Sequence, residues 1–319
     1  MNGARELPVD RSGDDTVRVA PPSRGREGAR RRRRRIRPLG IVRGFVIAAL
    51  LLWTLVPILL MIDASLETQA QLTGVPFKWL PDPLTFRNYL SLLFGQYGSS
   101  NSSTATQLYF EGLRNSLIIA SGTTLLSSSV GILGGYAFSR FRFRGKEPLF
   151  FATMTMQMFP FIAMLVPLFL LVRQLGLRDT WWSLILVDSA FIAPYAVWIM
   201  RNFFAAIPRD LDDAAAIDGA GRMRTLVSVV LPISAPGIAA IAIYAFLAAW
   251  NDFLAGFILT STPNAQPLTV LMAQFSSHNM ADIGLQITGG LLAALPPVVL
   301  VLVFQRYLVR GLTAGAVKG

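Results

Sequence analysis

The sequence predicts an all-α membrane protein with six transmembrane helices. Hydrophobic residues make up 53% of the 319 residues and charged residues only 15%, and the mean hydropathy is +0.51. This composition is too apolar for a soluble domain of that length. Six apolar runs are each long enough to cross about 30 Å of hydrocarbon as a helix. They lie at about 41–64, 113–138, 149–172, 181–199, 231–259 and 287–309.

Prolines occur within or beside most of these runs. A proline inside a transmembrane helix is tolerated where neighbouring helices satisfy the backbone groups that it leaves free. We therefore expect kinked helices packed on one another, although some prolines mark only the start or the end of a helix. The prolines concerned are Pro57, Pro160, Pro167, Pro194, Pro236, Pro296 and Pro297.

Basic residues predict the orientation of the chain. They gather in the segments 5–43, 140–146, 201–224 and 306–318, whereas the opposite side holds Lys78, Arg87, Arg114, Arg173 and Arg178. The positive-inside rule places the richer segments, and with them both termini, in the cytoplasm. Residues 1–40 are interpreted as a disordered basic tail that can touch anionic lipid, in preference to a nucleic-acid-binding arm or a cleavable signal peptide.

The sequence offers little for covalent chemistry. There is no cysteine and one histidine, His278, so we expect neither a disulfide framework nor a metal site. No phosphate-binding P-loop, nucleophile elbow or zinc-protease signature occurs. We therefore expect a non-catalytic chain with no cofactor of its own, whose energy source is a partner.

A polar segment at about 208–232 separates two of the apolar runs. Asp210 is expected to cap a first short helix that starts after Pro208. Gly219 permits a sharp turn of the backbone. A second amphipathic helix is expected to end before Pro232, with a face made of Met223, Leu226, Val227 and Val230. The orientation above places this loop in the cytoplasm, where a soluble protein can reach it.

This loop resembles the EAA loop of ABC-transporter permease subunits. Asp213-Ala214-Ala215, Gly219 and Pro232 fill the pattern, with Asp213 in place of the usual Glu. Other segments resemble the sugar-permease branch of that family in the expected order, and the chain ends in Val-Lys-Gly as the maltose-type subunit does. These segments are 79–89, 115–117, 136–140, 158–160, 176–180, 250–253, 267–270 and 304–319.

The resemblance implies a type-I permease domain over residues 41–319, in a bacterial cytoplasmic (inner) membrane. It implies a homologous second permease, two copies of a cytoplasmic ATPase that bind ATP and Mg, an extracytoplasmic solute-binding protein and a carbohydrate substrate. It also assigns two sets of residues to contact with the ATPase. These are the coupling-loop residues Asp213, Ala214, Ala215, Asp218, Gly219, Ala220 and Pro232, and the tail residues Ala316, Val317, Lys318 and Gly319.

Polar residues within the apolar runs are candidates for the substrate path, because they are costly in lipid and tend to face a cavity or a partner. Asp188, Phe191 and Tyr195 share one helical face, and a carboxylate with two aromatic rings suits a sugar. The facing wall is expected to hold Trp250, Asn251 and Leu254.

Alternative interpretations remain open for each of these features. The polar loop can be an ordinary connector, Asp188 can lie near the outer interface or pair with another subunit, and Trp250 and Asn251 can serve helix packing. The same architecture can import glycerol phosphate or an amino acid. An ion-driven secondary transporter is a further alternative, although it would need coupling carboxylates and inverted repeats.

Overall fold

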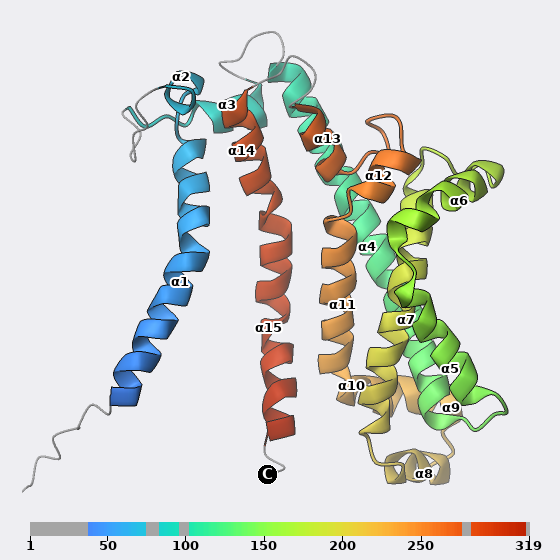
Figure 1. Ribbon diagram of the computed structural model, residues 1–319. Coiled ribbons are helices and arrows are strands. Elements are labelled where there is room, and N and C mark those ends of the chain that lie inside the picture. The colour runs from blue at the N-terminus through green and yellow to red at the C-terminus, as the bar shows by residue number, and fades with distance from the viewer. Residues whose placement is uncertain (1–37, 75–82, 96–101, 276–281, 317–319) are drawn as a thin grey trace, which may run out of the picture. The chain divides into compact units, whose positions relative to one another are not determined.

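The computed structural model describes residues 38–74, 83–95, 102–275 and 282–316. All regular structure in these ranges is helical (Figure 1). In chain order the elements are α1 (Pro38–Ser65), α2 (Gln69–Leu72), α3 (Arg87–Phe94), α4 (Ser102–Arg140), α5 (Lys146–Thr155), the 3₁₀ turn η1 (Met156–Met158), α6 (Phe161–Gln174), α7 (Trp181–Ala205), α8 (Asp210–Ile217), α9 (Arg222–Thr225), the π-helical turn η2 (Leu226–Val230), α10 (Leu231–Ile233), α11 (Ala235–Trp250), α12 (Leu254–Leu259), α13 (Leu268–Phe275), α14 (Ile283–Ala293) and α15 (Leu295–Ala316).

The prediction of an all-α membrane protein is confirmed, with four to six candidate spans in the described residues. Four helical stretches are long and apolar enough to cross a membrane: Val42–Ser65, Thr104–Arg140, Trp181–Ala205 and Ile283–Tyr307. Two further spans are broken helices, of which Lys146–Met158 with Phe161–Gln174 bends by 99° and Arg222–Ile233 with Ala235–Trp250 bends by 81°. The third and fifth apolar runs are therefore not the continuous helices that their length suggests.

Proline accounts for the break between η1 and α6. Phe159 precedes Pro160 and has extended backbone angles, φ −75° and ψ 128°, which is the conformation that a following proline ring favours. Pro160 in turn lacks the N–H that a helix passing through this point would need.

The chain divides into two compact units at residue 52. In the first unit, the described side chains at 42–52 belong to the amino-terminal part of α1 and are all exposed. Most of them are large and apolar, so this part of α1 suits a lipid or protein surface. The second unit, residues 53–319, contains all the features described below.

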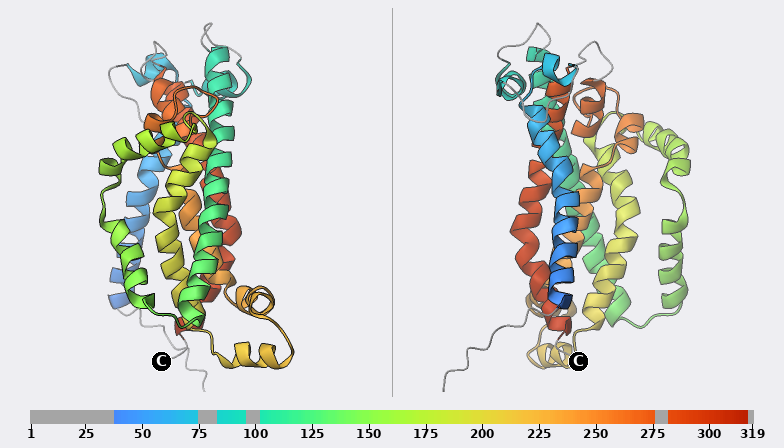
Figure 2. Two further views of the ribbon diagram at one scale, coloured as in Figure 1. Left: turned by 90° about the vertical axis from the view of Figure 1, so that its right-hand side faces the viewer. Right: turned by 60° about the vertical axis from the view of Figure 1, so that its left-hand side comes forward.

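In the second unit α4 lies against α7 along a stripe of glycines (Figure 2). A Cβ atom added to Gly131 would lie 2.7 Å from the Cβ atom of Ala196. One added to Gly135 would lie 2.6 Å from the Cβ atom of Met200 and 2.8 Å from the backbone nitrogen of Arg201. Small residues therefore let two backbones approach closely, as is usual where membrane helices pack without a hydrophobic driving force.

A buried cluster joins the end of this helix pair to the loop that follows α7. Tyr136 of α4, Met200 and Phe204 of α7 and Leu226 and Val230 of η2 are all buried in it. The Tyr136 ring meets the Phe204 ring edge-on at 6.0 Å between centroids. The π-helical turn is thus the part of the loop that packs into the bundle.

A polar cluster ties the helices together at the opposite end of the bundle from α8 (Figure 1). Asn115 donates from Nδ2 to the Pro263 and Gln266 carbonyls at 2.7 and 2.8 Å, and it accepts from Trp181 Nε1 at 3.0 Å. The backbone N–H of Leu268 donates to Ser116 Oγ at 2.8 Å. The sequence patterns at 115–117 and 267–270 therefore meet in one hydrogen-bonded cluster.

Asp179 anchors the neighbouring loop at the same end. Its Oδ1 accepts from the backbone N–H groups of Ser261 and Thr262 at 2.8 and 3.0 Å, and its Oδ2 accepts from Thr262 Oγ1 at 2.8 Å. Burial raises the pKa of Asp179, but these hydrogen bonds outweigh it and hold the pKa below its ordinary value of 3.8. The backbone of Asp179 is left-handed, with φ 58°, a conformation in which Asp is among the better tolerated residues.

Candidate functional site

The polar segment 208–232 forms two short helical pieces joined at a sharp turn. Gly219 has a φ of 77°, which only glycine adopts without cost, so the expected turn is present. Asp210 is not a cap, which corrects the prediction: α8 begins at Asp210 itself, and its N-cap residue Arg209 makes no side-chain capping bond. The carboxylates of α8's first turn instead lie near the positive end of the helix dipole.

The second piece also departs from the prediction. Its helical backbone does not end before Pro232 but continues through η2 and α10 to Ile233. Pro232 occupies one of the first two positions of α10, where a missing N–H is tolerated. Leu226 and Val230 are buried, whereas Met223 and Val227 are exposed, because the wider π turn separates residues that a regular helix would place on one face.

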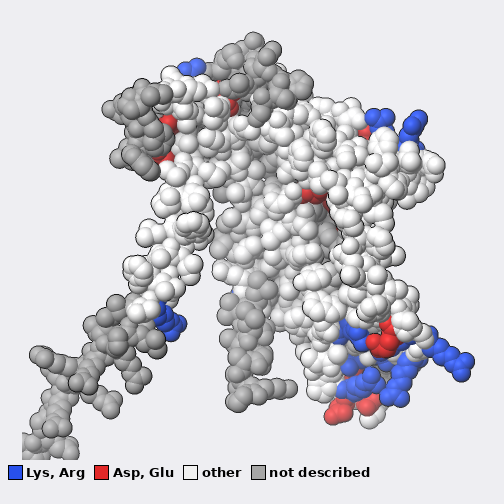
Figure 3. Space-filling view, in the orientation of Figure 1, with Lys and Arg blue, Asp and Glu red and all other residues white. Residues whose placement is uncertain are grey.

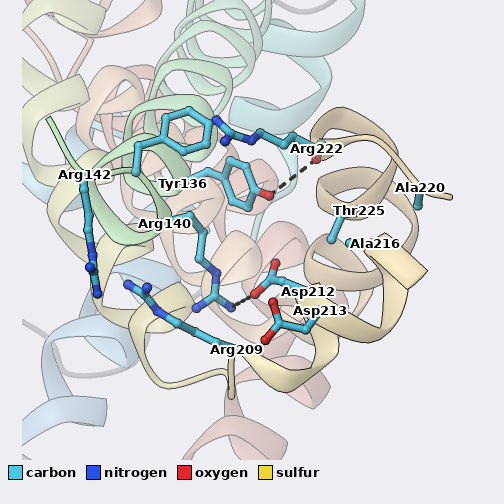
Figure 4. Close-up of a pocket in the computed structure, with 11 residues that line it drawn as sticks. Tyr136, Arg140, Arg142, Arg209, Asp212, Asp213, Ala216, Ala220, Arg222 and Thr225 are labelled. Carbon is cyan, nitrogen blue, oxygen red and sulfur yellow. Dashed lines mark hydrogen bonds and ion pairs between the residues drawn. The ribbon is translucent and has the colours of Figure 1, made fainter. Parts of the chain in front are cut away.

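An arginine from α4 holds the loop in place. Arg140 Nη2 lies 3.0 Å from Asp212 Oδ2, and the exposed fractions of the two side chains are 8% and 22%. The same guanidinium donates from Nη1 and Nη2 to the Ile207 carbonyl, both at 3.2 Å. Arg209 Nη2 donates to the Ser139 carbonyl at 3.4 Å. The last turn of α4 therefore contacts the loop at Arg209 and Asp212 and contacts Ile207 just before it, and Figure 4 shows the pair Arg140 and Asp212.

Arg140, Arg209 and Asp212 also line a cavity of about 470 Å³. Arginines and carboxylates dominate its lining (Figure 4), and Figure 3 shows basic side chains gathered at this end of the bundle. The residues that line it are Tyr136, Arg140, Phe141, Arg142, Arg209, Asp212, Asp213, Ala216, Ala220, Arg222 and Thr225.

The predicted coupling residues differ in exposure. Asp213 is exposed, and its side chain forms no hydrogen bond or ion pair with any residue that the structure describes. Ala214, Asp218 and Gly219 are also exposed, Ala220 is half-buried, and Ala215 is buried. Ile217 is the most exposed large apolar residue of the loop, at 87%. Thus α8 offers a carboxylate without a partner and an uncovered apolar side chain to anything that approaches from outside.

A second cavity, of about 370 Å³, lies between α7, α11 and the broken span α5–α6. Asp188 and Phe191 line it, as the predicted face of α7 requires. The remaining lining residues are Gln157, Phe159, Phe161, Ile192, Tyr244, Ala248 and Asp252.

The other predicted path residues do not line this cavity. Tyr195 stacks on Trp198 at 5.6 Å between ring centroids. Trp250 is buried and stacks on Phe246 at 5.5 Å. Asn251 is exposed and donates from Nδ2 to the Leu247 carbonyl at 2.7 Å, and Leu254 is exposed as well. The structure therefore joins Asp188 and Phe191 in one site and leaves Tyr195, Trp250, Asn251 and Leu254 outside it.

Sequence reasoning missed Asp252 and Gln157. Asp252 is adjacent to Asn251, but α11 ends at Trp250, so helical spacing does not predict where Asp252 points. Gln157 lies at the break between α5 and α6, and its Nε2 donates to the Phe191 carbonyl at 2.5 Å. Of the predicted tail residues, Ala316 ends α15, whereas Val317, Lys318 and Gly319 lie outside the described residues.

Comparisons with known proteins agree on one family. Residues 127–314 match the family model described as binding-protein-dependent transport system inner membrane component. The trehalose transport system permease protein SugB of Mycobacterium tuberculosis is 36% identical over 269 residues, which cover 84% of this chain and 93% of that protein. The trehalose/maltose transport system permease protein MalG of Thermococcus litoralis is 34% identical over 266 residues, which cover 83% and 92%.

A solved structure has the same fold. One chain of a bacterial ABC transporter involved in the import of the acidic polysaccharide alginate superposes with a TM-score of 0.69 at 24% identity, covering 86% of this chain and 98% of that chain. Because the family model spans more than half of the chain and the relatives match most of it, the chain belongs to the binding-protein-dependent transport system inner membrane components, the permease subunits of ABC importers.

Proposed function

We propose that this permease forms half of the translocation pore of an ATP-driven importer and that its substrate is a carbohydrate. Two relatives named for trehalose and maltose transport are 36% and 34% identical to it over 84% and 83% of its length. The patterns that resemble the sugar-permease branch, such as those at 115–117 and 176–180, supply the residues of the polar cluster and the Asp179 anchor. The identity to these two relatives favours a sugar over an amino acid or glycerol phosphate.

The geometry of α8 carries the coupling part of the proposal. On one side the loop is fixed to α4 through Arg140 and Asp212, and on the other it presents exposed Asp213 and Ile217. A helix that is anchored on its inner face and uncovered on its outer face suits a docking element. Asp213 would pair with a basic side chain of a cytoplasmic ATPase, and Ile217 would enter an apolar depression on it.

The remaining partners follow from this assignment. A homologous second permease would complete the pore, two ATPase copies would bind ATP and Mg, and an extracytoplasmic solute-binding protein would deliver the substrate. The chain would lie in the bacterial inner membrane with both termini and the loop 208–232 in the cytoplasm. Residues 41–319 would form the permease domain, residues 1–40 a basic tail, and residues 316–319 a further contact with the ATPase.

The substrate path would run past Asp188 and Phe191. These residues lie on α7, and the opposite wall of their cavity includes Tyr244 and Ala248 of α11. The loop connects α7 to α11, so a displacement of α8 acts on both walls at once. This is the arrangement that alternating access requires.

Purification of the tagged chain from its native membrane tests the proposal. We expect a second permease and an ATPase to co-purify, and we expect ATP hydrolysis to rise when trehalose or maltose is added with the recovered binding protein. Recovery of the chain without an ATPase would refute the coupling assignment and restore the ion-driven alternative. Stimulation by amino acids or glycerol phosphate in place of sugars would refute the substrate class alone.

A further inference from the structure

The cavity between α7, α11 and the α5–α6 break is acidic. Asp188 and Asp252 are the two charged residues among those that line it, and both are carboxylates. Among the residues that the structure describes, no Lys, Arg or His belongs to this lining. Figure 3 shows an acidic patch within the otherwise uncharged surface between the two charged ends of the bundle. When both carboxylates are ionised, their charges repel each other in this low-dielectric space unless a positive or hydrogen-bond-donating group lies between them.

The two carboxylates are satisfied to different degrees. Asp252 Oδ1 accepts from the backbone N–H of Ala255 at 3.4 Å, near the start of α12. Asp188 is only 7% exposed, and its Oδ2 has no hydrogen-bond partner within the described part of the chain. A carboxylate buried to this extent costs several kcal/mol unless it is paired. The hydrogen-bond donor that Asp188 lacks is therefore expected to come from a molecule that occupies the cavity.

Aromatic rings complete the lining. Phe161 meets Phe191 edge-on at 4.8 Å between centroids, and Phe159 and Tyr244 line the same space. Ring faces attract cations and cover the apolar faces of sugar rings. The Gln157 amide donates to the Phe191 carbonyl, and this bond is not directed at either carboxylate. An ionised carboxylate accepts hydrogen bonds and donates none.

We propose that this cavity is a charge filter on the substrate path, which admits neutral or amino-bearing sugars and rejects sugars that carry carboxylate, sulfonate or phosphate groups. A hydroxyl or ammonium group supplies the donors that Asp188 and Asp252 need, whereas an anion adds a third negative charge. The filter rests on the proposed function, because a charge preference selects substrates only if the cavity lies on their path. It also predicts a substrate of different charge from the acidic polysaccharide named for the similar solved structure.

The absence of cysteine from the chain permits a direct test. Ala248, which is half-buried, lines the cavity, so the variant Ala248→Cys places a single thiol there. The purified complex is treated separately with two methanethiosulfonate reagents of similar size, one bearing trimethylammonium and one bearing sulfonate. Labelling of this chain is followed by its mass shift. Leu84→Cys, at an exposed site distant in sequence from both carboxylates, gives the reference ratio of the two rates.

The expected result is a cation-to-anion rate ratio at Ala248→Cys that exceeds the ratio at Leu84→Cys by about tenfold or more, since a cleft lined by one sign of charge concentrates counter-ions by at least that factor. Adding Asp188→Asn and Asp252→Asn should return the ratio to the reference value. A ratio measured at one site cancels any change in the reactivity of the thiol itself.

Three results would overturn the filter. Equal ratios at the two sites would show that the carboxylates are neutral or already paired. A high ratio that persists in the double Asn variant would assign the effect to other groups. A failure of both reagents to reach Ala248→Cys and, as a second position in the lining, Phe159→Cys would show that lipid or a partner seals the space. None of these measurements uses ATP, a sugar or a binding protein, so failure of the filter and failure of the proposed importer are separate outcomes.

Discussion

Asp212 and Asp213 are neighbours in sequence but have different environments, and substituting each by Ala separates anchoring from docking. Asp212 is ion-paired with Arg140 at 3.0 Å, and the Arg140 side chain is 8% exposed. Removing one partner of a buried pair costs about 3–5 kcal/mol. Because Asp212 is partly exposed and Arg140 keeps the Ile207 carbonyl, we expect Asp212→Ala to lower the free energy of unfolding by about 2–3 kcal/mol, below that range. Asp213→Ala removes an exposed carboxylate, and we expect a change within about 0.5 kcal/mol.

Two assays distinguish the pair. Denaturant unfolding of the purified chain in detergent reports the stability difference. Sugar taken up per ATP hydrolysed, in proteoliposomes with the partner subunits, reports coupling. We expect Asp213→Ala to insert and unfold like the parent chain but to hydrolyse ATP without transport.

A double variant supplies the control. Replacing a buried ion pair by apolar residues of similar volume is often neutral, so Arg140→Met combined with Asp212→Leu should recover most of the lost stability. The interaction energy in this cycle should be about 1–3 kcal/mol. The reasoning is refuted if Asp212→Ala unfolds like the parent chain, or if Asp213→Ala transports with unaltered stoichiometry.

Three further predictions concern contacts elsewhere in the second unit. The pKa of Asp179 lies below 3.8, so the hydrogen bonds from Ser261 and Thr262 to its carboxylate should be fully present above about pH 4 and be lost as the pH falls through that lower pKa. Hydrogen exchange of residues 260–266 should show this acid transition in the parent chain. The transition should be absent from Asp179→Asn. Gly135→Ala should destabilise the bundle by about 1–3 kcal/mol, since its Cβ would lie 2.6 Å from that of Met200. The control Gly290→Ala, whose added Cβ has no described atom within 4 Å, should keep the parent stability or raise it by up to about 1 kcal/mol, because alanine favours a helix over glycine. Gln157→Ala should raise hydrogen exchange in the middle of α7, through loss of a bond worth about 1 kcal/mol. Unchanged exchange would show that this bond does not stabilise α7.

The features that sequence predicts well are those set by a single residue or by overall polarity. Apolar runs of sufficient length predict spans because lipid cannot satisfy a backbone that is not helical. Gly219 predicts a sharp turn because a positive φ is free of strain only for glycine. Pro160 hints at a break in the third span, but the 99° angle between its halves depends on packing that no local pattern contains.

The features that sequence misses depend on contacts between distant segments. The pattern of α8 does not say which of Asp212 and Asp213 turns inward, because that choice depends on Arg140, about 70 residues earlier in the chain. The predicted position of Asn251 on one face of α11 requires the helix to continue past Trp250. However, α11 ends at Trp250. The chain then turns, Asp252 enters the cavity wall, and Asn251 bonds back to its own helix.

The irregular elements lie where the two sites must communicate. Between α8 and the cavity wall on one side is Pro194, inside α7; on the other are the π-helical turn η2 and the 81° bend before α11. A regular helix transmits a displacement as a rigid rod, whereas a proline kink or a π turn can absorb it as a change of angle. A displacement at Asp213 would therefore reach Asp188 and Ala248 as rotation of the two walls about these points, which changes the width of the cavity. The ion pair between Arg140 and Asp212 fixes α8 to α4. Loss of this ion pair should therefore impair transport as well as stability.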